Sequence, residues 1–262
     1  MAASASLLTL AGRVAIVTGA SRGIGRAIAS YLHSLGARVV VNYIVDPVEA
    51  DDLVAELSGR VVSSLATAIA VKANIADPDQ VKHLFDQAEK VFGSPVHIVI
   101  NNAGVILTNY PTVTNTTSEE FDYIFNVNTK GTFLCSREAA NRLARGGGGR
   151  IINISTSVIG SLLPGYSAYA SSKAAVETMT KILAKELKGT GITANCVAPG
   201  PVKTALFLEG KSEEALKAIA EVGPFGRIGE PEDIMHLVGF LASDGGEWVN
   251  GQAIKVNGGM II

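Results

Sequence analysis

The strongest constraint on the fold of this chain is the regular alternation of short apolar runs with longer amphipathic runs. The apolar runs of the first half predict strands at Val14–Thr18, Val39–Tyr43, Ala68–Ala73 and Val96–Asn101. The runs between them predict helices at Gly23–Leu35, Pro47–Leu57 and Asp77–Phe92. Strands that alternate with helices in this way are typical of βαβ units and a parallel sheet.

The second half of the chain repeats this scheme. Helices are predicted at Ser118–Leu143 and Tyr169–Leu187, and strands at Arg150–Ile154, Ile192–Val197 and Ala253–Val256. The Gly146–Gly149 run is interpreted as a surface turn. Nearly continuous apolar strands indicate a sheet that helices cover on both faces. We therefore expect an α/β fold: a single Rossmann-type domain over residues 1–262, with a doubly wound parallel sheet of about seven strands.

Composition argues against several classes of function. Hydrophobic residues make up 47% of the 262 residues, yet no uncharged apolar run reaches the ~18 residues of a membrane span. The net charge of −2 and the lack of basic runs argue against nucleic acid as a partner. The two cysteines, Cys135 and Cys196, lie in apolar patterns and are interpreted as buried, reduced thiols, and we expect no metal site.

The start of the chain bears on its location. The first ten residues contain no arginine and run directly into the first predicted strand. We therefore expect neither a transit nor a secretory peptide and a cytoplasmic location, with a longer organellar precursor as the alternative.

A glycine-rich turn follows the first predicted strand where a helix begins. Gly19, Gly23 and Gly25 would let the backbone approach a pyrophosphate, and the free N–H groups of a helix start favour anions. Their Gly-x-x-x-Gly-x-Gly spacing is a variant of the usual dinucleotide fingerprint, in the strand–turn–helix context that the fingerprint requires. We predict a dinucleotide site; the alternative is a turn that simply needs small residues.

The second predicted strand ends without the carboxylate that NAD sites usually place there. Asn42 and Tyr43 occupy this position, and the next carboxylate, Asp46, lies beyond the strand. Arg22 lies within the glycine loop, where its charge would attract a 2′-phosphate. NADPH is therefore favoured over NADH. A solvated surface charge is the alternative reading of Arg22.

Tyr169 and Lys173 are four positions apart at the start of a helical pattern. Residues at i and i+4 are neighbours on one helical face, and an ammonium near a phenol favours its ionised form. A tyrosine placed in this way can act as a general acid or base. Taken alone, the pair favours the simpler interpretation, a tyrosine on a core-facing stripe and a solvated lysine.

Further motifs occur in order along the chain: Asn101–Gly104 after the fourth predicted strand, Asn128 in the next helix, and Pro199–Thr204 after Tyr169 and Lys173. With the glycine loop, they make the chain resemble the short-chain dehydrogenase/reductase family over essentially its whole length. Asn74, with Ile75, falls where the family contacts the adenine and replaces the commoner Asp. The cofactor-binding residues predicted from the motifs and this resemblance are Gly19, Ser21, Arg22, Gly23, Ile24, Gly25, Asn42, Tyr43, Asn74, Ile75, Asn101, Ala103, Gly104, Tyr169, Lys173, Pro199, Gly200, Val202 and Thr204.

The resemblance also implies a mechanism. Tyr169 would donate a proton to a carbonyl oxygen as hydride arrives from the nicotinamide. Lys173 would bind the nicotinamide ribose and lower the pKa of Tyr169. Asn128 would hold a water that links Lys173 to solvent, and a hydroxyl before the tyrosine would orient the carbonyl.

The identity of this hydroxyl is ambiguous. The family places a serine just after the fifth strand, about 13 or 14 residues before the tyrosine. Counting from the strand, or at a spacing of 13, indicates Thr156, whereas counting back from Gly160 indicates Ser157 and a spacing of 14 indicates Ser155. Thr156 is our prediction, with Ser157 next, although the threonine methyl would crowd the pocket.

Residues Ala205–Phe225 would form a substrate lid by the same resemblance. Apolar lining would come from Leu206, Phe207, Leu208 and Phe225, and across the cleft from Leu162, Leu163 and Tyr166. Lys203 and Lys211 are too few to indicate an anionic substrate. We expect a small or medium apolar aldehyde or ketone; the alternatives are a 3-oxoacyl group on acyl carrier protein and, because some proteins of this fold bind NADP(H) without turnover, a non-catalytic sensor.

The end of the chain is apolar and strand-like. The family builds tetramers with this region, and exposed apolar residues at a free terminus are unfavourable. We therefore expect a homotetramer.

Overall fold

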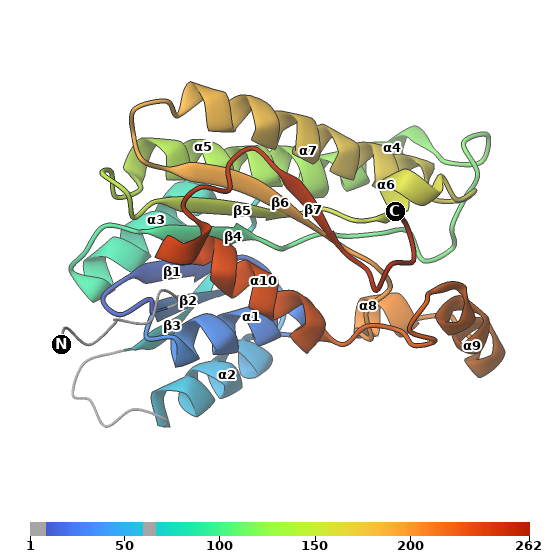
Figure 1. Cartoon of the computed structure of the whole chain (residues 1–262), viewed down its shortest axis with the longest axis horizontal. Helices are drawn as coiled ribbons and strands as arrows, with labels where there is room; N and C mark the ends of the chain where they lie inside the picture. Colours follow the sequence, from blue (N-terminus) through green and yellow to red (C-terminus); the bar gives the residue numbers. More distant parts are fainter. Residues whose placement is uncertain (1–8, 60–66) are drawn as a thin grey trace.

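The sheet is the central layer of the molecule, whose computed structural model describes residues 9–59 and 67–262 (Figure 1). Most of the amino-terminal stretch used for the targeting prediction lies outside these ranges. Seven parallel strands pair in the order β3-β2-β1-β4-β5-β6-β7. Their bounds are β1 (Val14–Val17), β2 (Arg38–Tyr43), β3 (Ala68–Lys72), β4 (Ile98–Asn101), β5 (Arg150–Ile154), β6 (Thr193–Pro199) and β7 (Ala253–Val256). The predicted doubly wound parallel sheet is confirmed.

Helices cover both faces of the sheet (Figure 1). One layer contains α1 (Gly23–Ser34), α2 (Pro47–Gly59) and α10 (Pro231–Ala242). The other contains α3 (Pro78–Phe92), α5 (Thr132–Arg142) and α7 (Ser167–Glu186). Ala15 and Val17 face the first layer, and Val14 and Ile16 face the second, because successive side chains of a strand point to opposite faces. All four are fully buried, which explains the continuous apolar run of β1.

The predicted helix at Ser118–Leu143 is divided into three parts. α4 (Ser118–Phe125) begins with a capping box between Thr117 and Glu120, and α5 ends the stretch. Between them, η1 (Asn126–Gly131) is a π-helix, which the sequence pattern does not reveal. Such π segments often occur at functional sites, and this one contains Asn128. The helix thus widens where a candidate catalytic residue lies.

The segment expected to form a lid contains two short helices, α8 (Ala205–Leu208) and α9 (Glu213–Val222). In Figure 1 they lie beyond the carboxyl ends of the strands, apart from the two helical layers. A further short helix, α6 (Val158–Ser161), follows β5 on the way to α7, and η2 (Asp244–Gly246) follows α10. Among the described residues, no helix is long and apolar enough to cross a membrane, and no cluster of metal-ligating side chains occurs.

Both cysteines are buried, free thiols, as expected. Burial raises the pKa of Cys135 and of Cys196 to about 12. Neither thiol is therefore ionised at neutral pH, so neither is suited to act as a nucleophile.

Candidate active site

The glycine loop lies at the carboxyl end of β1, at the point between β1 and β4 where the order of the strands in the sheet reverses. Gly19 has φ +60, and a Cβ there would lie 2.9 Å from the Cα of Ala103. A Cβ on Gly25 would lie 2.3 Å from the carbonyl oxygen of Gly19. Only glycine fits these positions, and the helix that begins here, α1, carries no acidic residue in its first turn. The loop therefore fits the pyrophosphate of a dinucleotide.

Thr18 and Asn102 hold this loop against β4, although neither was among the predicted site residues. The Oγ1 atom of Thr18 accepts hydrogen bonds from the backbone N–H groups of Asn102 and Ala103, both at 3.0 Å. In return, Nδ2 of Asn102 donates to the carbonyl oxygens of Thr18 and Gly19, both at 3.0 Å. The available signal was the position of Asn102 inside the Asn-Asn-Ala-Gly motif.

Asn42, at the end of β2, connects the loop with the neighbouring strands. Its Oδ1 accepts from the backbone N–H of Gly19 at 3.2 Å, and its Nδ2 donates to the carbonyl oxygens of Val71 and Ala73. The side chain is almost fully buried. Asn42 thus positions the loop from the place where NAD sites usually carry a carboxylate.

Arg22 precedes α1 and is exposed. Among the described residues, its guanidinium has neither an ion pair nor a hydrogen bond, so it is available to an anion. One carboxylate does approach the loop, because Ser21 Oγ donates to Oε2 of Glu49 at 3.3 Å. The sequence pattern did not identify Glu49, which lies in the first turn of α2.

Some of the remaining predicted cofactor residues contact the glycine loop or η1, whereas Asn101 does not. Pro199–Thr204 begins at the last residue of β6 and meets the glycine loop, since a Cβ on Gly23 would lie 3.2 Å from Cγ2 of Thr204. Ile75 packs against η1, where a Cβ on Gly131 would lie 2.7 Å from its Cδ1. Asn101 points into the interior instead, where its Nδ2 donates to Ser136 and Asn153.

Three other predicted positions, and Val202 of the stretch just described, lie at or after the carboxyl ends of the strands. The Oδ1 of Asn74 accepts from the backbone N–H of Ala76 at 3.0 Å, which fixes the turn after β3. Tyr43 is half-buried at the end of β2, and Val202 is buried beside an isolated bridge to Gly229. Ile24 packs against the core from the first turn of α1.

Lys173 and Asn128 lie together beside Gly104, and Tyr169 precedes Lys173 by one turn of α7. Lys173 is buried and its Nζ donates to the carbonyl oxygen of Ile154, at the end of β5, at 2.8 Å. A Cβ added to Gly104 would lie 3.2 Å from Oδ1 of Asn128 and 3.3 Å from Nζ of Lys173. The side chains of Asn128 and Lys173 therefore both approach Gly104, in the turn after β4.

Ser172 connects Asn128 with the tyrosine helix, a contact that sequence reasoning missed. The Nδ2 of Asn128 donates to Ser172 Oγ at 3.1 Å, and this hydroxyl donates to the carbonyl oxygen of Tyr169 at 2.7 Å. The amide of Asn128 also exchanges two hydrogen bonds with the backbone of Val105, at 2.8 and 2.9 Å. These bonds fix the π-helix relative to α7.

The electrostatics differ from one expectation. Burial raises the pKa of Tyr169 above its usual value, more than the hydrogen bond with Thr156 lowers it, and Lys173 is not among the causes. The predicted lowering by Lys173 is therefore wrong for this structure. Burial also lowers the pKa of Lys173 to about 8. At neutral pH, Tyr169 is a protonated phenol that can donate a proton.

The three candidate hydroxyls after β5 have different surroundings. The Oγ1 of Thr156 accepts from the backbone N–H of Val158 at 3.2 Å, and the hydroxyl is close enough to the phenol of Tyr169 to lower its pKa. Ser155 instead donates to Oε1 of Glu177 at 2.7 Å. The hydroxyl of Ser157 is buried without a hydrogen-bond partner among the described residues. The position next to the phenol favours Thr156.

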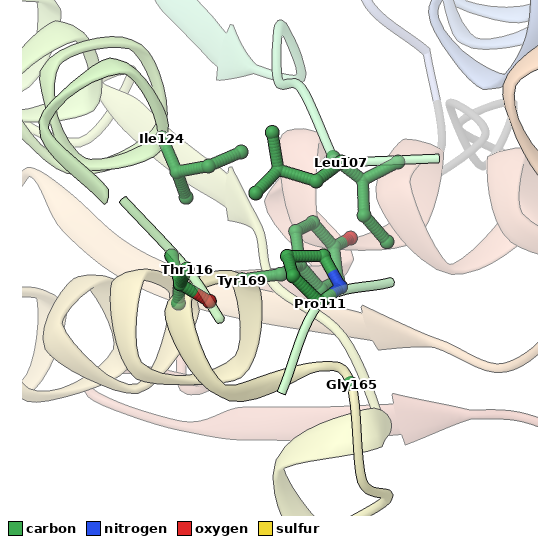
Figure 2. A pocket seen from close by; sticks show the side chains of 8 residues that line it. Leu107, Pro111, Thr116, Ile124, Gly165 and Tyr169 are labelled. Atoms are coloured by element: carbon green, nitrogen blue, oxygen red, sulfur yellow. The ribbon is translucent and has the colours of Figure 1, made fainter. Parts of the chain in front are cut away.

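Most of the apolar residues predicted to line the substrate cleft are exposed. They are Leu162 and Leu163, which follow α6, and Leu206, Leu208 and Phe225 of the lid segment. Figure 2 shows a separate, apolar pocket beside the ring of Tyr169. The pocket is lined by Ile106, Leu107, Pro111, Thr116, Ile124, Gly165, Ala168 and Tyr169. The catalytic candidate therefore forms one wall of an apolar space built by the turn after β4.

Replacement of Gly25 by alanine tests the nucleotide cradle. The new Cβ would overlap the carbonyl of Gly19 at 2.3 Å and Nδ2 of Asn102 at 2.5 Å. We expect NADPH to bind at least about tenfold more weakly and the free energy of unfolding to fall by about 1–3 kcal/mol. Fluorescence titration and urea unfolding measure the two effects. Gly59→Ala, where nothing lies within 4 Å, is the matched control; unchanged NADPH binding in Gly25→Ala would remove the cradle assignment.

Replacement of each hydroxyl in turn tests the assignment of Thr156. Thr156→Val keeps the shape and removes the donor, so kcat for carbonyl reduction is expected to fall about 10²-fold. Ser157→Ala removes a hydroxyl without a partner among the described residues, and Ser155→Ala removes one bound to Glu177, so neither should change kcat by more than about twofold. Steady-state kinetics decide, and a loss confined to Ser157→Ala would move the role to Ser157.

An anion cradle lined by glycine, next to a protonated tyrosine and a buried lysine, defines a nucleotide-dependent oxidoreductase. Residues 19–261 match the family model described as Enoyl-(Acyl carrier protein) reductase. The NADPH-dependent aldehyde reductase-like protein, chloroplastic, of Arabidopsis thaliana is 60% identical over 97% of this chain and 96% of its own length. The NADPH-dependent aldehyde reductase 2, chloroplastic, of the same plant is 56% identical over 100% of both chains.

A solved structure is also similar. The short chain dehydrogenase from Burkholderia cenocepacia J2315, in complex with NADP, is 33% identical and superposes with a TM-score of 0.86, over 96% of this chain and 98% of that one. The chain belongs to the short-chain dehydrogenase/reductase family, and it is an oxidoreductase.

Proposed function

We propose that this protein is an NADPH-dependent reductase of small or medium aldehydes and ketones. The observation that carries the proposal is the protonated phenol of Tyr169, close to the hydroxyl of Thr156 and one helical turn before the buried Lys173. Because its pKa is raised, this phenol is protonated at neutral pH and holds the proton that a carbonyl oxygen needs in the reductive direction. The names of the two Arabidopsis relatives support the same activity.

Each residue has a defined part in this proposal. When bound, NADPH would supply the hydride that reduces the carbonyl carbon. Tyr169 donates the proton that converts the carbonyl oxygen into a hydroxyl, and Thr156 orients that oxygen. Lys173 holds a positive charge behind Tyr169 and binds the nicotinamide ribose. Asn128 orders the path by which a proton returns to Tyr169.

The apolar surroundings support a substrate whose carbonyl group is attached to an apolar chain. Leu206 and Phe225 of the proposed lid, residues 205–225, and Leu162 on the opposite side are all exposed. Two cations near the lid are already neutralised, Lys203 by Glu230 at 2.5 Å and Arg227 by Asp233 at 2.6 Å. This pairing does not favour docking of an acidic carrier protein. The test is NADPH oxidation, followed by loss of absorbance, with a panel of alkanals, aryl aldehydes and ketones; no turnover of any of them would refute the activity.

Arg22 is proposed to select NADPH over NADH. Arg22→Gln removes the charge that would face the 2′-phosphate, so we expect KM for NADPH to rise about tenfold while KM for NADH changes little. Lys188→Gln, a substitution at an exposed position after α7, is the control for net charge. Equal cofactor preference in Arg22→Gln and in the wild type would contradict this role.

We also propose that the protein forms a homotetramer. Tyr123 and Phe133, from α4 and α5, are about half exposed and line a groove together with Met179 of α7. Trp248 is 98% exposed, and the terminal Ile262 is fully exposed. Contact between copies would bury these apolar side chains. Light scattering is expected to give about four times the 27.2 kDa of the chain, and a monomer would refute the proposal.

The proposed location is the cytoplasm. Both Arabidopsis relatives are named as chloroplastic, which supports a plastid as the alternative. Fractionation of plant cells that express the untagged chain distinguishes the two, because a plastid protein resists added protease until the envelope is broken.

A further inference from the structure

Lys211, in the proposed lid between α8 and α9, reaches across to the turn after β4. Its Nζ donates to the phenol oxygen of Tyr110 at 2.5 Å and to the carbonyl oxygen of Phe207 at 2.7 Å. The same ammonium lies over the rings of Tyr110 and Phe207, 4.8 and 4.7 Å from their centroids. Four contacts therefore fix a lysine that is separated from Tyr110 by 101 positions in the sequence.

Tyr110 connects the ammonium group of Lys211 with the tyrosine rings beside the proposed proton donor, Tyr169. The rings of Tyr110 and Tyr166 are 5.0 Å apart, and those of Tyr166 and Tyr169 are 6.5 Å apart. The phenol of Tyr110 is close enough to raise the pKa of Tyr169. Lys211 thus lies at the far end of a row of tyrosine rings that begins at the proposed proton donor.

The backbone holds Tyr110 in place. Tyr110 has φ +46, a conformation that costs energy in residues other than glycine. A Cβ on Gly165 would lie only 2.7 Å from its carbonyl oxygen, so the two loops are in direct contact. Strained conformations of this kind persist where the surroundings enforce them, often at ligand-binding positions.

Lys211 differs from its neighbours in charge pairing. Lys203 and Arg227 each face a carboxylate, whereas the partners of Lys211 in the described part of the chain are a phenol, a carbonyl group and two aromatic rings. Its positive charge is therefore uncompensated. An ammonium has three N–H donors, of which these hydrogen bonds use two. One donor and a full charge remain for a ligand.

We propose that Lys211 determines substrate specificity by binding a carboxylate at the end of the substrate opposite to its carbonyl. The inference rests on the proposed carbonyl reduction and defines the substrate class more closely, as oxo acids in which an apolar chain separates the carbonyl from an anionic group. The apolar lining would contact the chain, Tyr169 the carbonyl oxygen, and Lys211 the carboxylate. Counting lysines in the sequence does not favour such a substrate; their pairing in the structure does.

The experiment compares ω-oxo acids of four to six carbons with n-alkanals of the same lengths. For the wild type, kcat/KM is expected to be higher for the acid than for the alkanal at one of these lengths. Lys211→Met removes the charge and keeps the stem, and Lys211→Gln keeps an N–H donor for Tyr110 without the charge. Both should lower the acid-to-alkanal ratio by about tenfold or more, because a hydrogen bond to an ionised group is lost.

Two further variants separate the charge from its surroundings. Lys211→Arg retains a cation and should retain most of the ratio, and Lys217→Met removes an exposed charge from α9 of the same lid and should leave it unchanged. An unchanged ratio in Lys211→Met, or an equal fall in Lys217→Met, would overturn the proposal. Turnover of the alkanals tests carbonyl reduction separately, so failure of one idea is distinguishable from failure of the other.

A binding measurement gives the same test without turnover. Glutarate is titrated calorimetrically into the protein saturated with NADP⁺, in the wild type and in Lys211→Met. Binding to the wild type that weakens about tenfold in the variant supports the contact, and equal affinities in the two proteins overturn it.

Discussion

Tyr169→Phe is expected to lower kcat for NADPH-dependent aldehyde reduction by about 10²–10⁴-fold, because the only group lost is the proton donor. The ring would keep its packing beside Tyr166 and its place in the wall of the apolar pocket (Figure 2). The affinity for NADPH, measured by fluorescence titration, should change less than about threefold. Stopped-flow reduction of a single turnover separates this loss from slow product release.

Tyr123→Phe is the matched control, since Tyr123 is exposed on α4 and outside the site. It removes the same hydroxyl and should leave kcat unchanged. Equal rates for Tyr169→Phe and the wild type would refute the role of Tyr169 as the proton donor.

Lys173→Met is expected to abolish most activity while making the protein more stable. Burial lowers the pKa of Lys173 to about 8 in the folded chain, from 10.5 in the unfolded one. Below pH 8 both states are protonated, and holding the buried charge opposes folding by about 3 kcal/mol. Methionine has a similar stem without the charge, so the free energy of unfolding at pH 7 should rise by about 1–3 kcal/mol, less the lost bond to Ile154.

The pH dependence provides a second measurement on the same variant. A folded-state pKa below the unfolded value means that folding releases a proton, so wild-type stability should increase as pH rises from about 8 to 10.5. Lys173→Met should lack this increase. Lys181→Met, at an exposed position of α7, should retain it. A decrease in wild-type stability across this window would contradict the burial of a protonated Lys173.

The rate should respond to the same group. Because the charged Lys173 is proposed to bind the nicotinamide ribose, kcat of the wild type is expected to fall as pH rises through about 8. The remaining activity of Lys173→Met, expected to be about 10²-fold lower at pH 7, should be nearly flat over that range. A parallel decline in both proteins would assign the titration to another group.

The sequence predicted the sheet and the order of the motifs correctly because both depend on local patterns. A buried parallel strand needs an apolar run, as in β1, and a nucleotide loop needs glycines at Gly19 and Gly25. The start of α3 was also readable, since Asp77, where the predicted helix begins, caps α3 by accepting hydrogen bonds from the backbone of its first turn. The π-helix at Asn128 was not readable, because the hydrogen bonds that fix it come from Val105 and Ser172 in other segments.

The sequence by itself determined that this chain forms a doubly wound α/β sheet with a glycine loop and a Tyr169–Lys173 pair on one helical face. Only the tertiary structure decided how these groups behave. Burial, which depends on packing from several elements, raised the pKa of Tyr169 and lowered that of Lys173. The path of the chain after β5 brought the hydroxyl of Thr156, rather than Ser155 or Ser157, to the phenol. Contacts between distant segments also left Lys211 without a carboxylate partner in the described part of the chain, which no spacing along the sequence can show.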